Sequence, residues 1–320
     1  MIQTILSVRI PLLLMLAISA GATAGFAQPQ PGAAPPSGLA ALAATNPKQP
    51  VFDDPAAAAE AFRALLAADK FDEIADLLGL DSAKLKASDG TQQSYADIRQ
   101  AAAEGIILKD LGDGKVLELG KKLWPFPFPL NRDAKGKWSF NTQVGLEEIR
   151  NRRIGENELE AIATVRAYVD AQRLYATVDR DGDGVLEFAQ KLVSSEGQTD
   201  GLYWPADQGD GESPAGDMVD TEAMDKARRG EGYFGYRFRI LTGQGDNVAG
   251  GKYDYIINGN MIAGFALLAW PVTYGETGVH TFAVNQNGIV YETDLGPNTE
   301  TMVRYIDRFN PDDDWQVVTD

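Results

Sequence analysis

The side chains best placed to do chemistry form an acidic run directly after a long apolar-periodic segment. Positions one, three, five, six, seven and nine of an EF-hand-like loop are occupied here by Asp179, Asp181, Asp183, Gly184, Val185 and Glu187. Alternate carboxylates and a backbone carbonyl can converge on a hard cation, and the glycine permits the sharp turn that this convergence needs. The pattern predicts a calcium site with Asp179, Asp181, Asp183, Val185 and Glu187 as its ligands.

The loop departs from the EF-hand pattern at position twelve, where Gln190 replaces the bidentate glutamate. Without that ligand we expect weak affinity, in the ~0.1 to 1 mM range of extracellular modules. Aspartate and glycine also favour a solvent-exposed turn with no ion, so the sequence leaves both interpretations open. A bound ion would be structural rather than catalytic, holding the helix end against the segment that follows.

An aromatic and proline run from Trp124 to Leu130 is the second candidate site. Its prolines cannot donate to a sheet ladder, so the run is predicted to be an extended edge or loop. Trp124, Phe126 and Phe128 could form an interaction surface for an envelope protein or a glycan. The alternative is that these three rings fill the core of a small domain.

No complete catalytic set is visible in the sequence. The single histidine, His280, lies in a strand-like run, where a packed or surface role is favoured over a general base. The serines at 194, 195 and 213 lack the glycines of a nucleophile elbow. A glycosidase-like mechanism needs two carboxylates at a defined separation, and the sequence cannot select them from its 46 acidic residues. The sequence therefore favours a protein that is not an enzyme.

The elements that position these residues predict an α+β fold. Short helices are expected from Asp53 or Asp54, over 71–78 and over 94–103, followed by short strands that form a small curved antiparallel sheet. One long helix from Asn157 or Glu158 to about 178 should then pack on a second antiparallel sheet. A hairpin is predicted at 285–288, where Asn-Gln-Asn-Gly separates two alternating runs.

The N-terminal residues predict export. Arg9 precedes a short apolar run and small residues that signal peptidase accepts, so residues 1–27 are interpreted as a signal peptide. An uncleaved N-terminal anchor is the alternative. Residues 28–50 are rich in proline, alanine and glycine, which indicates a disordered tether. Two domains are expected, over 51–150 and 151–320. The mature protein is expected to be periplasmic or secreted, with no membrane span after the signal peptide is cleaved.

The amino-acid composition limits the classes of partner and site that the protein can have. The chain carries 29 basic and 46 acidic residues, which give a net charge of −17. Cleavage after residue 27 removes one arginine and no acidic residue. The mature chain then has 28 basic and 46 acidic residues, and its net charge is −18. Nucleic acid is disfavoured, because phosphate binding requires clustered lysine and arginine. The chain has no cysteine, which excludes disulfides and thiolate metal sites.

Several motifs in a fixed order resemble the bacterial domain-of-unknown-function family 2950, a family of exported proteins. The motifs lie at 124–130, 151–155, 167–172, 200–205 and 235–241, with further matching residues at 264–267, 270–271 and 274–275. The resemblance covers about 51–318 and implies no known activity. Phe234 departs from it, because members often carry a histidine there.

The C-terminal half is also distantly similar to the globular part of type IV pilin-like proteins. Its long helix and the runs at 186–189, 235–238 and 278–288 carry this similarity, which implies one helix packed on an antiparallel sheet. The long hydrophobic helix that builds a pilus is missing. Together these patterns predict a non-enzymatic binding or envelope-interaction module with a structural calcium loop. The alternative is a carboxylate-dependent hydrolase acting on envelope polymers.

Overall fold

The computed structural model describes residues 38–208 and 211–319. The predicted signal peptide lies outside the described residues, as does the first part of the predicted tether. The described part of the tether is not structureless, because Gly38–Leu42 form a 3-10 helix and Ala43 bridges to Leu80. Leu42 and Ala43 are apolar and pack against the first hydrophobic core, which explains why this stretch is ordered.

Four helices open the chain: α1 (Pro55–Ala67), α2 (Phe71–Leu78), α3 (Ser82–Ala87) and α4 (Thr91–Glu104). The Asp54 side chain caps α1 by accepting a hydrogen bond from the Ala57 N–H at 2.8 Å, as its sequence predicts. Helix α2 has the predicted bounds and ends at Gly79, whose positive φ of 71° closes the last turn. Helix α3 was not predicted; it follows Asp81, which caps it.

A small antiparallel sheet follows, with strand order β1-β2-β4-β5 and β3 paired to β2. The strands are β1 (Ile106–Leu111), β2 (Gly114–Leu119), β3 (Trp124–Pro125), β4 (Leu130–Arg132) and β5 (Trp138–Phe140). The first core gathers side chains from this sheet and from the opening helices, Phe62, Leu66, Leu117 and Phe140 among them. This part of the chain has the predicted order of helices followed by a small sheet.

Helix α5 (Thr142–Tyr175) is much longer than the sequence predicts. The predicted start at Asn157 is wrong: the Asn141 side chain caps the helix by accepting from the Val144 N–H at 3.1 Å. Glycines at 145 and 155 lower helix propensity without breaking the helix. Leu146 belongs to the first core, and residues from Ala161 onward belong to a second core.

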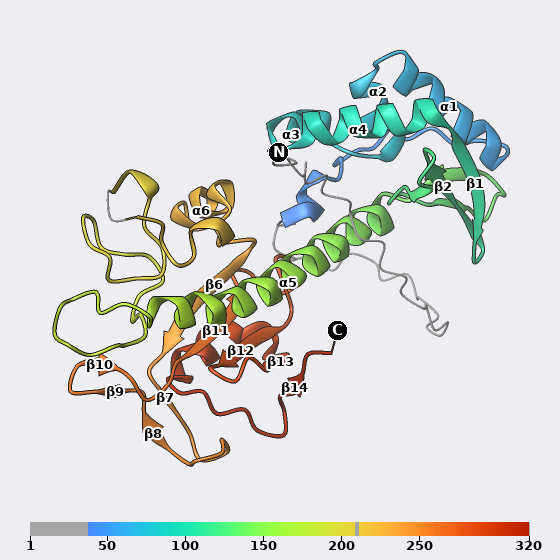
Figure 1. Ribbon diagram of the computed structural model, residues 1–320. Helices are drawn as coiled ribbons and strands as arrows, with labels where there is room; N and C mark the ends of the chain where they lie inside the picture. The colour runs from blue at the N-terminus through green and yellow to red at the C-terminus, as the bar shows by residue number, and fades with distance from the viewer. Residues whose placement is uncertain (1–37, 209–210, 320) are drawn as a thin grey trace. The chain divides into compact units, whose positions relative to one another are not determined.

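The second core surrounds a five-stranded antiparallel sheet of order β14-β13-β12-β11-β6 (Figure 1). Its strands are β6 (Tyr236–Leu241), β11 (Ala266–Pro271), β12 (Thr281–Asn285), β13 (Val290–Thr293) and β14 (Gln316–Val317). All residues of β11 and β12 are buried, because both faces of the sheet are covered. The predicted hairpin joins β12 and β13, and the Gly288 N–H donates to the Asn285 carbonyl at 2.9 Å.

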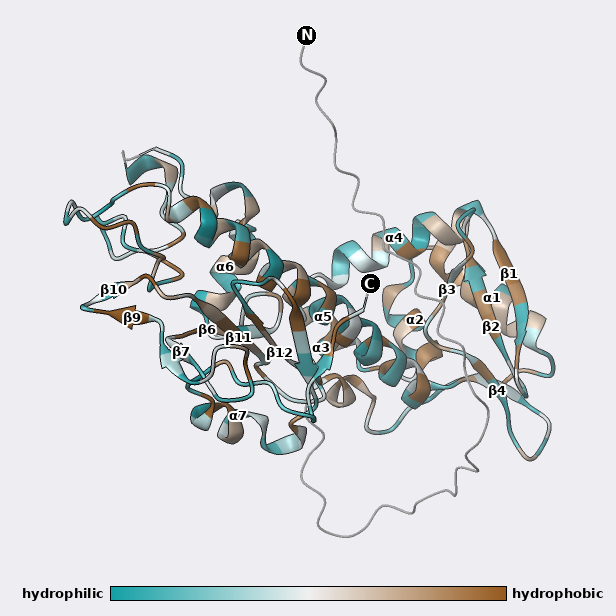
Figure 2. Cartoon of the chain, turned by 60° about the horizontal axis from the view of Figure 1, so that its bottom comes forward, coloured by the Kyte–Doolittle hydropathy of each residue, from teal (hydrophilic) through white to brown (hydrophobic). Residues whose placement is uncertain are grey.

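Short elements surround this sheet. They are α6 (Thr221–Arg228), α7 (Thr299–Met302), β7 (Gly243–Gln244), β8 (Tyr253–Asp254), β9 (Ile256–Ile257), β10 (Asn260–Met261) and 3-10 turns at Ala206–Gln208, Gly216–Met218, Gly296–Asn298 and Val303–Tyr305. The apolar residues of β9 stand out in Figure 2. The fold is α+β, as predicted. Within the described residues, no helix is long and apolar enough to cross a membrane.

Candidate functional site

The acidic loop, defined here as residues 179–190, brings together three of its five predicted ligands. One carboxylate oxygen from each of Asp179, Asp181 and Asp183 lies within 4.8 Å of the other two. The Asp179 carboxylate accepts from the N–H groups of Gly182 at 2.8 Å and Gly184 at 2.9 Å, which hold its pKa below the usual value. These local hydrogen bonds hold the Asp179 carboxylate in the turn, and the Asp183 carboxylate also accepts from the Asn260 side-chain amide of β10 at 2.6 Å.

Glu187 does not join this cluster. Its carboxylate accepts from the Met261 N–H at 3.1 Å, on the β9–β10 hairpin. Gln190 points to the same hairpin, where its amide donates to the Gly259 carbonyl at 2.7 Å. Glu187 has the sequence spacing of the ninth loop position, but its carboxylate is hydrogen-bonded to the β9–β10 hairpin instead of facing the cluster. Sequence spacing could not reveal that partner, because it lies about 70 residues away.

The aromatic and proline run lies mainly in the first core. Phe126 and Phe128 are 2% and 3% exposed, and the Phe62 ring packs on Phe126 with centroids 4.7 Å apart. Trp124 is partly exposed and lies under the Arg152 guanidinium. Two of the three rings are therefore core residues and offer no interaction surface.

An apolar cavity of about 440 Å³ lies between α5, the outer strand β6 and the segments 192–203 and 215–233. Representative lining residues are Ala167, Ala171, Met218, Met224, Tyr233 and Phe238. Its volume is within the ~300 to 1,000 Å³ range of small-molecule sites. The lining comes from widely separated segments with no shared motif, so sequence reasoning missed the cavity.

Most polar side chains that line the apolar cavity already have partners in the protein. The Tyr168 hydroxyl donates to the Ala266 carbonyl, the Tyr233 hydroxyl accepts from the Asp220 N–H, and the Trp270 indole N–H donates to Glu300. Within the described chain, Tyr203 is a lining residue whose hydroxyl makes no hydrogen bond. The wall thus presents mainly apolar and aromatic surface, with one spare hydroxyl.

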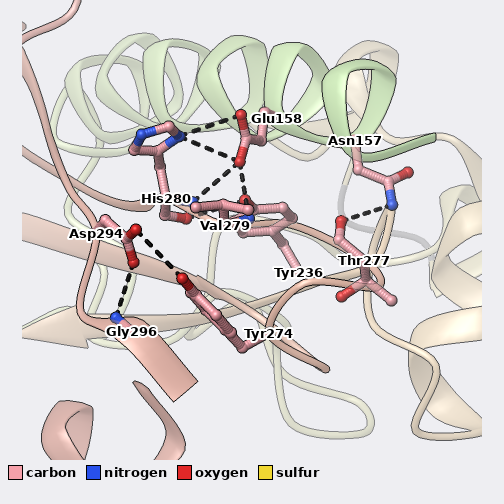
Figure 3. A network of polar contacts seen from close by, with 9 residues as sticks. All are labelled: Asn157, Glu158, Tyr236, Tyr274, Thr277, Val279, His280, Asp294 and Gly296. Carbon is pink, nitrogen blue, oxygen red and sulfur yellow. Dashed lines mark hydrogen bonds and ion pairs between the residues drawn. The ribbon is translucent and has the colours of Figure 1, made fainter. Parts of the chain in front are cut away.

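A polar network ties α5 to the turn before β12 (Figure 3). The Glu158 carboxylate accepts from the N–H groups of Val279 at 2.8 Å and His280 at 2.9 Å, and it lies 3.3 Å from His280 Nδ1. Burial alone would raise the pKa of Glu158, but these hydrogen bonds outweigh burial and hold the pKa below its usual value. The Tyr236 hydroxyl donates to the His280 carbonyl at 2.9 Å.

Glu158 also raises the pKa of the His280 side chain. Its hydrogen bond raises the pKa of His280 above 6.5, against the opposing effect of burial, and the carboxylates of Glu292 and Asp294 add to the rise. A carboxylate that orients an imidazole is half of a general-base arrangement. No serine, threonine or lysine side chain hydrogen-bonds this imidazole in the described part of the chain. The pair is therefore described best as a clamp between α5 and the sheet.

The clamp predicts a pH dependence of stability. The folded state binds the His280 proton more tightly than the unfolded state, so the contribution is complete below about pH 6.5 and falls as pH rises through the raised pKa. We expect the melting temperature of the wild type, relative to His280→Gln, to fall as the pH rises above about 6.5. Thermal melts at a series of pH values measure this difference. Parallel curves for the two proteins would contradict the clamp.

One comparison with known proteins identifies the family of this chain. Residues 49–318 match the family described as "Protein of unknown function (DUF2950)", and the chain belongs to this family. Neither the curated proteins nor the solved structures gave a match. The similarity to pilin-like domains thus stays a prediction, as does the division into domains at residue 150.

Proposed function

We propose that this chain is an exported, non-enzymatic binding protein whose apolar cavity holds an apolar group of its ligand. The cavity beside α5 carries the proposal, because a hollow of this size lined by aromatic and aliphatic side chains is the usual form of a small-molecule site. The signal-like N-terminus supports a periplasmic or secreted location, where the partner would be an envelope component.

The wall chemistry restricts the ligand. A glycan or an ion would need several spare donors or acceptors, and the hydroxyls of Tyr168 and Tyr233 are already engaged. An acyl chain or an aromatic ring gains from burial without such partners. The Tyr203 hydroxyl can serve one polar group of the ligand.

The alternative, a carboxylate-dependent hydrolase, gains no support from this cavity. Glycoside hydrolysis needs a pair of carboxylates flanking the bond to be cleaved. The described lining residues include no aspartate or glutamate. If the purified protein hydrolysed an envelope polymer, the hydrolase alternative would replace the binding proposal.

Filling the cavity tests the proposal. Ala167 lines the cavity from α5, whereas Ala163 lies one turn earlier on the same helix and is exposed. We expect the neutral fluorescent probe N-phenyl-1-naphthylamine to bind the wild type, and Ala167→Phe to weaken binding by about tenfold or more. Ala163→Phe is the matched control and should stay within about twofold of the wild type. Absence of probe binding, or equal binding by both variants, would refute the proposal.

We also propose that the acidic loop binds calcium weakly as a structural brace. Three carboxylates at one turn support this, although Glu187 and Gln190 are engaged with the β9–β10 hairpin. Weak affinity in the ~0.1 to 1 mM range follows from the small ligand set.

Calcium is therefore expected to raise the melting temperature. At about tenfold excess over Kd the gain is about 1.4 kcal/mol, and changing chelator for about 5 mM calcium should raise the melting temperature by about 2 °C. Asp181→Asn combined with Asp183→Asn should abolish the rise, because the amides keep the local hydrogen bonds and lose the charge. Glu196→Gln, an exposed acid outside the cluster, should leave the rise intact. If the melting temperature of the wild type is the same in chelator and in about 5 mM calcium, the acidic loop is not a calcium site of this affinity.

A further inference from the structure

A second hollow, the polar cleft, lies on the other face of the C-terminal sheet. Its volume is about 870 Å³, and its floor includes Ala283 of β12 and Thr293 of β13. Side chains alternate along a strand, so Phe282 belongs to the opposite face, where it packs against Tyr236 near Glu158 of α5. The polar cleft and the apolar cavity are therefore separate sites.

The floor of the polar cleft contains one threonine hydroxyl without a hydrogen-bond partner. Thr293 lines the cleft, is only 8% exposed, and makes no side-chain hydrogen bond in the described part of the chain. Directly opposite it in the ladder, Thr281 is fully buried and its Oγ1 also has no partner. Buried hydroxyls are normally paired, so an unpaired one at the floor of a cleft indicates a position for a hydrogen-bonding ligand.

The walls add aromatic faces and further polar groups. Tyr305 is 82% exposed, an unusual position for a large ring. Trp315 is a second aromatic lining residue and is partly buried. Across the described residues, the side chains of Asp246, Asp307 and Lys252 form neither hydrogen bonds nor ion pairs. The cleft thus offers free acceptors, a free donor and a hydroxyl that can do both.

We propose that the polar cleft binds a neutral oligosaccharide. Sugar hydroxyls both donate and accept, which matches this mixture of groups, and the C–H face of a sugar ring packs on an aromatic face. The acidic lining residues Asp246, Asp294, Asp307, Asp312 and Asp314 outnumber Lys252 and Arg308. Arg308 is held by Asp254 at 2.6 Å and by the Tyr253 carbonyl. An anionic glycan would therefore be repelled.

Calorimetric titration with N-acetylchitotetraose and cellotetraose, with tetragalacturonate as the anionic control, tests the proposal. We expect at least one neutral sugar to bind and the anionic one not to bind. Tyr305→Ala should weaken binding by about tenfold, whereas Tyr305→Phe should stay within about threefold. Ile289→Ala, an exposed residue outside the cleft lining, is the control for a surface change and should bind as the wild type does.

Thr293→Val separates a binding role from a structural one. The substitution keeps the shape of the side chain and removes a hydroxyl that has no partner, so the fold should be as stable as the wild type or more stable. Binding of the neutral sugar should weaken about fivefold. The proposal is overturned if neither neutral sugar binds at about 10 mM, or if Tyr305→Ala and Thr293→Val both bind as the wild type does.

A site-resolved signal distinguishes the two hollows. Met302 lines the polar cleft, whereas Met218 and Met224 line the apolar cavity. In protein labelled with ¹³C at the methionine methyl groups, the neutral sugar should shift the Met302 resonance and leave those of Met218 and Met224 in place. Shifts confined to Met218 and Met224 would place the sugar in the apolar cavity and overturn this proposal.

Discussion

Replacing Gly145 with alanine is expected to lower the free energy of unfolding by about 3 kcal/mol, although alanine is the better helix former. A Cβ atom at position 145 would lie 2.0 Å from a ring carbon of Phe128. That ring is 3% exposed and packs against Phe126, so it has little room to move. The clash therefore exceeds the gain in helix propensity.

The matched control lies ten residues along the same helix. Gly155 has no atom within 4 Å of the position its Cβ would take. Gly155→Ala should therefore raise the free energy of unfolding by up to about 1 kcal/mol. Chemical denaturation of both variants measures the two changes. A stabilising Gly145→Ala would show that the aromatic and proline run is not packed in the core against α5.

The second large effect concerns Gln172, which is fully buried on α5. Its amide oxygen accepts from the Ala189 N–H at 2.8 Å, while its nitrogen donates to the Ala189 carbonyl at 2.8 Å and to the Tyr168 hydroxyl at 3.0 Å. The side chain thus satisfies both backbone groups of Ala189, a buried residue near the C-terminal end of the acidic loop. These contacts hold that end of the loop against the helix.

Gln172→Met keeps the side-chain volume and removes all three hydrogen bonds. Each buried backbone group left unpaired costs about 1–3 kcal/mol, so we expect a loss of about 2–5 kcal/mol in the free energy of unfolding. Leu174→Ala, at a position 53% exposed on the same helix, should change it by less than about 0.5 kcal/mol. Equal denaturation midpoints for the two variants would contradict this role of Gln172.

Local signals predicted much of the fold. The glycine at 79 ends α2, Asp54 caps α1, and the run 285–288 closes the predicted hairpin. Each of these features depends on residues close together in the chain. Such features can be read from a sequence because turn and cap chemistry is local.

The errors have a local and a tertiary cause. The predicted helix start at Asn157 missed a local cap, because Asn141 caps α5 and the helix begins at Thr142. Glu187 has the spacing of a ligand, but the β9–β10 hairpin binds its carboxylate. The apolar cavity and the polar cleft have linings from many segments, so no local pattern marks them.

Methionine methyl resonances give the most direct test of the central claim, that the apolar cavity is a ligand site. Two described methionines, Met218 and Met224, line the cavity; Met261 is buried elsewhere in the second core and Met302 lines the polar cleft. Titration with N-phenyl-1-naphthylamine is predicted to shift the resonances of Met218 and Met224 in the wild type and not in Ala167→Phe. Shifts confined to Met302, or no shifts at saturation, would contradict the claim.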